Sequence, residues 1–135
     1  QTLTEARTGF VSDLRPKASD ADPVPNPPAD RFHLVRYKSP KGEFPAYISK
    51  VPNDGKKYPA SIWITGGDCN SIDDGCWNKG PEKNEQSASA FREANIVTMF
   101  PSLRGGNKNP GPKESFLGEV DDILAARKFL AEQPY

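Results

Sequence analysis

The feature that most constrains the fold of this chain is a pair of short apolar runs separated by a helix-like segment. The runs occupy residues 62–64 and 96–100 and are rich in β-branched and aromatic residues. Runs of this kind are typical of strands that are buried in a sheet. Residues 85–94 carry apolar side chains at helical spacing, with Asn84 as the predicted N-cap and Asn95 as the predicted C-cap. Strand, helix and strand in this order predict a parallel crossover and therefore an α/β fold.

Two further patterns surround this crossover. Residues 32–37 and 44–51 alternate enough to pair as an antiparallel hairpin around a turn at residues 39–42. Residues 116–132 repeat apolar side chains every three to four positions, which predicts an amphipathic helix. Its predicted inner face comprises Phe116, Val120, Ile123 and Leu130, and its predicted solvated face comprises Glu119, Asp121, Asp122, Lys128 and Glu132.

The chain divides into two parts. Residues 1–31 are predicted to be an N-terminal extension and proline-rich linker, because they are polar and contain four prolines between positions 23 and 28. Residues 32–135 are predicted to form part of one α/β domain. A short helical turn is predicted within residues 4–14, and its expected apolar contacts are Phe10, Val11 and Leu14.

Charge and composition argue against two classes of partner. Lys+Arg and Asp+Glu both number 18, so the formal net charge is +0 and the basic surface typical of a nucleic-acid-binding protein is missing. Hydrophobic residues make up 35% of the chain, and no run is long and apolar enough to span a membrane. We therefore expect neither a nucleic-acid partner nor a membrane span. Oligomeric state and cellular location stay open.

A pair of glycines follows the first apolar run, in the sequence Thr65-Gly66-Gly67. Without side chains, Gly66 and Gly67 allow peptide N–H groups to approach a substrate oxygen closely at the end of a strand. The alternative interpretation is an ordinary turn, for which a Gly-Gly pair is equally suited.

Cys69 and Cys76 follow the glycines and have two possible states. Their spacing closes a small loop, and we predict a disulfide that would suit a periplasmic or secreted protein. Two free thiols, which would suit a cytosolic protein, are the alternative. The neighbouring acidic residues do not match a calcium loop, since Asp73 and Lys79 stand where glycine and glutamate are needed. No metal or cofactor is therefore predicted.

The order of these motifs resembles the N-terminal half of an α/β-hydrolase domain of the prolyl oligopeptidase family, in its dienelactone-hydrolase-like form. The resemblance covers residues 32–135 and is carried by residues 65–67, the segment 101–106 and the acidic helix around 119–123. It implies a mostly parallel sheet with an N-terminal antiparallel hairpin, incomplete in this chain. The family continues with a Gly-x-Ser-x-Gly nucleophile, an Asp and a His. No such serine motif lies in this chain, and we predict non-catalytic, structural roles for Ser71, Ser87, Ser89, Ser102 and Ser115. His33 lies on a predicted strand, and we predict that it is a structural or surface residue.

The resemblance also implies the chemistry and part of the site. It implies a serine hydrolase in the complete protein, with the oxyanion held by the backbone amides of Gly67 and Asp68. Peptidases of the family have a tyrosine where this chain has Thr65, and the shorter side chain favours an ester or other small acyl substrate over a peptide. The residues implied in substrate binding are Thr65, Gly66, Arg104, Gly105 and Gly106.

Two alternatives stay open at this point. Arg104 is equally compatible with a structural turn, in which its guanidinium ties down a loop. The chain is alternatively part of a non-catalytic extracytoplasmic binding or interaction module, whose glycine-rich loop and proline-rich segment hold a partner. A strand followed by Gly-x-Ser-x-Gly in the residues after position 135 would distinguish the hydrolase from the module.

Overall fold

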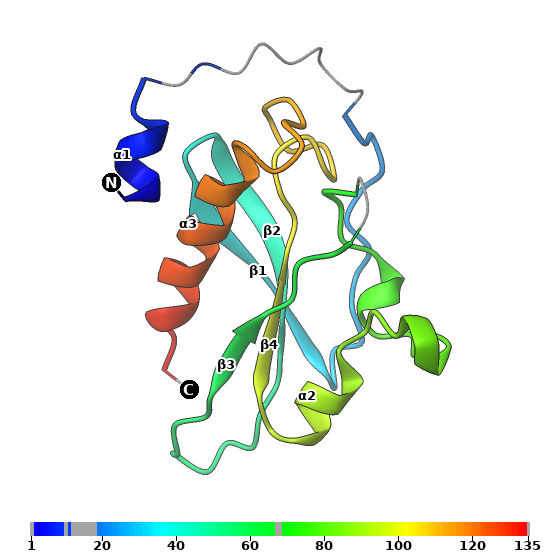
Figure 1. The fold of residues 1–135 in the computed structure, drawn as a ribbon. Helices are drawn as coiled ribbons and strands as arrows, with labels where there is room; N and C mark the ends of the chain where they lie inside the picture. The colour runs from blue at the N-terminus through cyan, green and yellow to red at the C-terminus, as the bar shows by residue number, and fades with distance from the viewer. Residues whose placement is uncertain (1, 10, 12–18, 67–68, 135) are drawn as a thin grey trace.

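The computed structural model of the protein describes residues 2–9, 11, 19–66 and 69–134. In this part of the chain, four strands form one sheet in the order β1-β2-β4-β3 (Figure 1). The strands are β1 (Phe32–Ser39), β2 (Gly42–Ser49), β3 (Ala60–Ile62) and β4 (Val97–Pro101). The helices are α1 (Leu3–Arg7), α2 (Ser89–Glu93) and α3 (Glu119–Ala131), with 3-10 turns η1 (Asp74–Cys76) and η2 (Glu82–Asn84). The predicted α/β class is confirmed.

Helices lie on both faces of the sheet (Figure 1). On one face, Ala126 of α3 packs in a buried cluster that includes Met99 of β4. On the other face, Phe100 of β4 packs with Ala88, beside α2, and with Ile72 from the long loop after β3. Successive β4 side chains therefore enter different cores, which explains why this strand is a continuous apolar run in the sequence.

The predicted hairpin and crossover are both present. β1 and β2 pair antiparallel along their whole lengths, with Phe32 opposite Ser49 and Ser39 opposite Gly42. β2 also pairs antiparallel with β4, whereas β4 and β3 pair in parallel, with Ala60 opposite Val97. α2 lies between β3 and β4 in the chain, so it forms the predicted parallel crossover.

β3 differs from the predicted strand in position and burial. The prediction placed a buried strand at residues 62–64, but β3 begins at Ala60 and ends at Ile62, and Ile64 is 51% exposed. One further ladder bond, from the Trp63 amide to the Met99 carbonyl, extends the pairing past the strand end. Within the described residues β3 pairs only with β4, so it is an edge strand and its side chains are incompletely covered.

α2 is shorter than the predicted helix at 85–94. Glu85 stands before the helix, and its carboxylate accepts the backbone amides of Ser87 at 2.7 Å and Ser89 at 3.1 Å. The expected N-cap, Asn84, lies in η2 instead. Asn95 follows the helix with a positive φ of 57°, the left-handed geometry of a helix terminator, as expected for this residue type.

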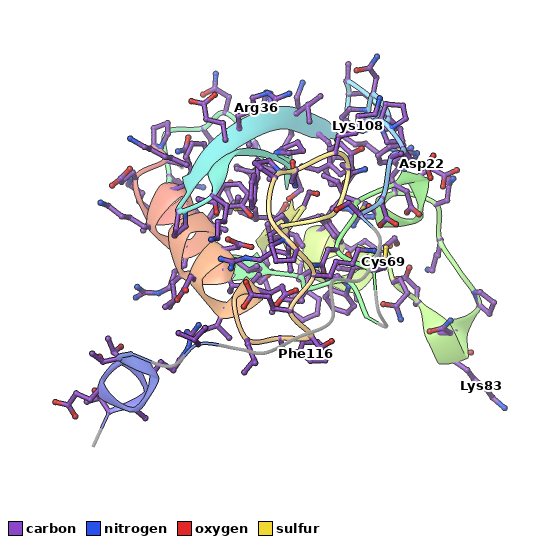
Figure 2. The ribbon with its side chains drawn as sticks, turned by 90° about the horizontal axis from the view of Figure 1, so that it is seen from above. Asp22, Arg36, Cys69, Lys83, Lys108 and Phe116 are labelled. Carbon is purple, nitrogen blue, oxygen red and sulfur yellow. The ribbon has the colours of Figure 1, made fainter. Side chains whose placement is uncertain are left out.

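α3 corrects the predicted assignment of its two faces. Glu119 and Asp122, expected in solvent, are 5% and 0% exposed, whereas Phe116, expected inside, is 70% exposed and projects from the surface (Figure 2). The reason lies under the helix, because Asp122 pairs there with the buried side chain of Arg104. Helical periodicity assigns carboxylates to water and cannot detect such a partner.

The N-terminal part makes few but specific contacts. α1 overlaps the predicted helical turn but begins one residue before it, at Leu3, and its Arg7 donates to Asp121 at 3.0 Å and to the Leu117 carbonyl. Of the expected apolar contacts, Val11 is 87% exposed, and Phe10 and Leu14 lie outside the described residues. Residues 19–28 form neither helix nor strand, as predicted. Among the described helices, none has the length and hydropathy required to cross a bilayer.

Candidate functional site

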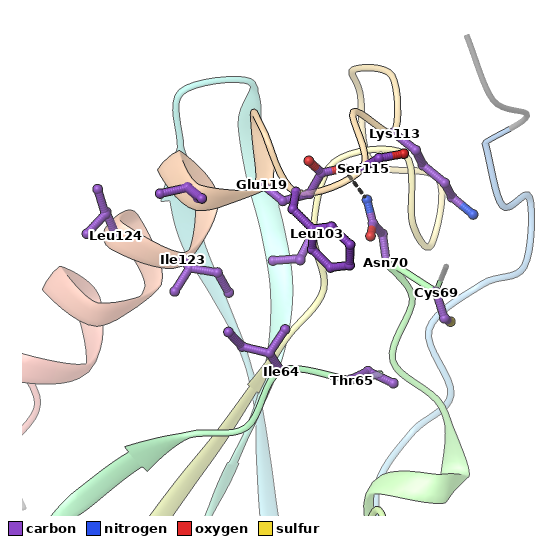
Figure 3. A pocket seen from close by; sticks show the side chains of 12 residues that line it. Ile64, Thr65, Cys69, Asn70, Leu103, Lys113, Ser115, Glu119, Ile123 and Leu124 are labelled. Carbon is purple, nitrogen blue, oxygen red and sulfur yellow. Dashed lines mark hydrogen bonds between the residues drawn. The ribbon is translucent and has the colours of Figure 1, made fainter. Parts of the chain in front are cut away.

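A pocket of about 170 Å³ opens where β3 ends, beside Thr65 and close to the first turn of α3 (Figure 3). Its apolar lining consists of Ile64, Leu103, Phe116, Val120, Ile123 and Leu124. Its polar lining consists of Thr65, Cys69, Asn70, Lys113, Ser115 and Glu119. Open α/β sheets bind ligands at the carboxyl ends of their parallel strands, and this pocket lies at the carboxyl end of β3.

The polar wall of the pocket is organised around Asn70 and Glu119. The side-chain amide of Asn70 donates to Glu119 Oε1 at 3.0 Å and to the Arg104 carbonyl at 2.7 Å. Glu119 Oε1 also accepts the backbone amide of Glu114 at 2.7 Å. Glu119 Oε2 is buried without a hydrogen-bond partner among the described residues. These bonds fix the side chain of Asn70 between the loop after β4 and the start of α3.

Only part of the predicted oxyanion loop falls within the described residues. Thr65 lines the pocket and Gly66 is exposed beside it, so these two predicted substrate-binding residues are placed at its mouth. Gly67 and Asp68 lie outside the described residues. Their proposed role as backbone donors stays a prediction.

Arg104 does not line the pocket, and its surroundings support the structural alternative. The residue is 3% exposed, and its guanidinium donates to both carboxylate oxygens of Asp122, at 2.9 and 3.0 Å, and to Glu114 at 2.8 Å. Burial lowers the pKa of Arg104, but the hydrogen bonds and charge of Asp122 and Glu114 outweigh it and raise the pKa above the ordinary value. The guanidinium is therefore engaged in ion pairs that hold α3 to the loop after β4, the loop that carries Arg104.

Gly105 and Gly106 shape the site without lining it. Gly105 has a φ of 70°, a left-handed conformation that favours glycine. Gly106 passes so close to the backbone carbonyl of Asn70 that a Cβ atom there would overlap it. Gly106 thus lets the loop after β4 lie directly against the loop after β3, whereas Gly105 allows close packing within the loop after β4, against Gly111 and Lys113.

A buried polar network beneath the pocket was missed by the sequence analysis. Asn107 Oδ1 accepts the Ile72 amide at 2.7 Å and the Ser102 hydroxyl at 2.8 Å, and Asn109 Nδ2 donates to Ser102 Oγ at 2.9 Å. The Ser102 hydroxyl shares its single proton with the Asn70 carbonyl, which lies 3.1 Å away, and these contacts agree with the structural role predicted for this serine. Only the density of Asn, Gly and Pro in the segment 105–112 could have indicated such a loop.

The predicted disulfide is not formed, because Cys69 and Cys76 are both free thiols. Cys76 is buried in the same apolar cluster as Phe32 and Phe100, and burial raises the pKa of its thiol to about 12. The sulfur of Cys69 lies 3.5 Å from the Ser71 carbonyl. The two side chains are thus held by separate neighbours.

The other candidate residues do not form a catalytic or metal-binding group in the described part of the chain. His33 is exposed on β1 and does not line the pocket, as expected for a structural or surface residue. Over the described ranges, no cluster of three or more His, Cys, Asp or Glu side chains is arranged to hold a metal ion.

The fold is similar to part of several solved structures of hydrolases. An α/β serine hydrolase without a lid from Xanthomonas campestris superposes with a TM-score of 0.52 at 17% identity, covering 82% of this chain and 48% of that one. An esterase from Pyrobaculum calidifontis superposes with a TM-score of 0.51 at 20% identity, covering 79% of this chain and 31% of that one. No family model and no curated protein matches the sequence.

These likenesses confirm the predicted fold, since the chain has the α/β-hydrolase architecture. Its mixed sheet, with one parallel and two antiparallel pairings, corresponds to a part of that fold. The chain spans about half or less of the length of these hydrolases.

Proposed function

We propose that the complete protein is a serine hydrolase that cleaves esters or other small acyl substrates. The observation that carries the proposal is the position of the pocket, which adjoins Thr65 and Gly66 at the carboxyl end of β3. A glycine-rich turn at this place in an α/β-hydrolase fold is where peptide amides can hold a developing oxyanion. The solved structures named above add support through their shared architecture.

The proposed reaction is an attack by a serine on an acyl carbonyl, with a histidine as base and an aspartate that orients it. The amides of Gly67 and Asp68 would hold the oxyanion, and one such donor contributes roughly 10²–10³ in kcat. The serine, histidine and aspartate of the triad would come from residues after position 135, because residues 1–135 contain no Gly-x-Ser-x-Gly and only one histidine.

The lining of the pocket supports an apolar acyl group as the part of the substrate bound here. Half of the lining residues are aliphatic or aromatic, and Ile64 lies across from Ile123 of α3 (Figure 3). Arg104 is occupied by Asp122 and Glu114, so it is not available to clamp a substrate carboxylate. Thr65, shorter than a tyrosine, also favours a small acyl substrate.

Labelling with a fluorophosphonate probe tests the reaction class. The complete protein is expected to be labelled and to hydrolyse a p-nitrophenyl ester, and replacing the serine of its Gly-x-Ser-x-Gly motif by alanine should abolish both. A complete protein without that motif and without labelling would contradict the proposal and favour the non-catalytic binding module.

A filled pocket tests the substrate class. Ile123→Trp should raise KM for p-nitrophenyl octanoate more than for the acetate, because the indole would occupy the space proposed for the acyl chain. Lys128→Trp, on an exposed position of the same helix, is the matched control and should leave both values unchanged. An equal change for both esters in Ile123→Trp would contradict an acyl role for the pocket.

A further inference from the structure

Asp20 joins the N-terminal segment to the two loops that form the polar side of the pocket. Its carboxylate accepts a hydrogen bond from the Ser71 hydroxyl at 2.7 Å and pairs with Lys113 Nζ at 3.1 Å. Its backbone amide donates to the Gly105 carbonyl at 2.8 Å, and its carbonyl accepts the Lys108 amide at 2.9 Å. A residue far from the site in sequence therefore contacts both loops at once.

The first partner of Asp20 leads directly to the wall of the pocket. Ser71 follows Asn70, which lines the pocket, and Ser71 Oγ also accepts the Asn107 amide at 3.0 Å. Asn107 in turn accepts the Ile72 amide at 2.7 Å. Asp20 thus completes a chain of hydrogen bonds that holds the segment 70–72 in place.

The second partner is itself a pocket residue. Lys113 lines the pocket, yet its side chain runs away from the apolar lining toward the N-terminal segment (Figure 3). Its side chain is 11% exposed, and the ammonium of a side chain so largely buried is stabilised by a partner of opposite charge. The carboxylate of Asp20 supplies that partner outside the pocket. The hydrogen bond from Ser71, and then Lys113, lower the pKa of Asp20 despite its partial burial.

We infer that Asp20 is a positioning residue, which fixes the polar wall through Ser71 and keeps the ammonium of Lys113 out of the acyl pocket. Its effect on catalysis rests on the proposed function, whereas its effect on the loops and on the charge of the pocket does not. Without Asp20, the Lys113 ammonium is free to turn toward the pocket and to attract an anionic ligand group. The pocket should then lose its preference for neutral apolar groups.

Hydrogen exchange tests the positioning of the loops without any need for activity. In Asp20→Ala, the amides of Ile72 and Asn107 are expected to exchange about tenfold faster, because the chain of hydrogen bonds loses its charged acceptor. Amides paired between β1 and β2 should keep their rates. Asp22→Ala is the matched control, since Asp22 is exposed on the same segment and makes no hydrogen bond or ion pair to the described residues. Unchanged rates at Ile72 and Asn107 in Asp20→Ala would overturn the inference.

Substrate preference separates a positioning role from a merely structural one. The ratio of kcat/KM for a neutral p-nitrophenyl butyrate to that for an anionic p-nitrophenyl succinate monoester should fall about tenfold in Asp20→Ala. Asp20→Asn keeps an acceptor for Ser71 but loses the negative charge. It should therefore lower the same ratio of kcat/KM values, while the amides of Ile72 and Asn107 exchange less fast than in Asp20→Ala. The double variant Asp20→Ala/Lys113→Met should restore the ratio. Faster exchange with an unchanged ratio would mean a structural role only and would refute the proposal.

A protein without esterase turnover would contradict the proposed function but would still test Asp20. The preference is then measured by binding of 1-anilinonaphthalene-8-sulfonate, which is anionic, against neutral N-phenyl-1-naphthylamine. Asp20→Ala should increase the affinity for the anionic probe relative to the neutral one, and Lys113→Met should reverse this increase. An unchanged ratio of the two affinities would overturn the inference.

Discussion

Replacing Asp122 by alanine is expected to lower the free energy of unfolding by about 3–5 kcal/mol, the usual effect of removing one partner from a buried ion pair. Asp122 is fully buried and accepts four hydrogen bonds at 2.6–3.0 Å, from the Ser39 hydroxyl and from the amide, Nε and Nη2 of Arg104. Without it, the guanidinium keeps only Glu114 as a charged partner among the described residues. The whole free energy of unfolding of a typical domain is roughly 5–15 kcal/mol, so this loss is a large part of it.

Urea unfolding, followed by circular dichroism, measures this loss. Asp121→Ala is the matched control, because Asp121 is the neighbouring residue and pairs with Arg7 near the surface, where an ion pair contributes about 0–1 kcal/mol. A double variant, Arg104→Met/Asp122→Leu, should recover part of the stability lost in Asp122→Ala, since it leaves neither the guanidinium nor the Asp122 carboxylate buried without its partner. If Asp122→Ala lowers the free energy of unfolding no more than Asp121→Ala does, the buried ion pair does not hold α3 to the loop after β4.

Four further outcomes are expected. Iodoacetamide at pH 8 should alkylate Cys69 faster than Cys76, because burial raises the pKa of the Cys76 thiol to about 12, and peptide mass spectrometry should show it; equal rates would contradict this burial. The unfolded thiol ionises near pH 9.0 and the native one does not, so the stability of the wild type relative to Cys76→Ala should fall as pH rises from 9.0 toward 12. Gly106→Ala should lower the free energy of unfolding by about 1–3 kcal/mol, and the Tm with it, because the added Cβ would overlap the backbone of Asn70. Gly66→Ala, whose Cβ would enter open space, should leave the Tm unchanged. Residues 1–135 expressed alone should self-associate through the edge of β3 that no described strand covers, and Ile64→Lys should reduce this self-association in size-exclusion chromatography; a monomeric wild-type chain of residues 1–135 with a sharp unfolding transition would refute the expectation.

Local patterns in the sequence determined the hairpin, the crossover and the buried strand β4. The reason is that alternation, apolar runs and turn residues report interactions between neighbours in the chain. β4 was predicted well because both of its faces are covered, so its apolar residues Val97, Met99 and Phe100 lie on both faces and not on one alone. The order of the motifs around Gly66 and Arg104 was enough to predict the α/β-hydrolase fold by resemblance.

The tertiary structure alone decided which polar residues are buried and what they hold. Asp122 was assigned to solvent because helical periodicity cannot detect Arg104, which lies beneath it. The state of Cys76 likewise depends on apolar neighbours from other elements. The role of Asp20 could not be predicted either, since its carboxylate accepts a hydrogen bond from Ser71, which lies 51 positions away in the sequence. A buried charge or thiol is stabilised by whatever the fold brings against it, and such partners leave no periodic pattern in the chain.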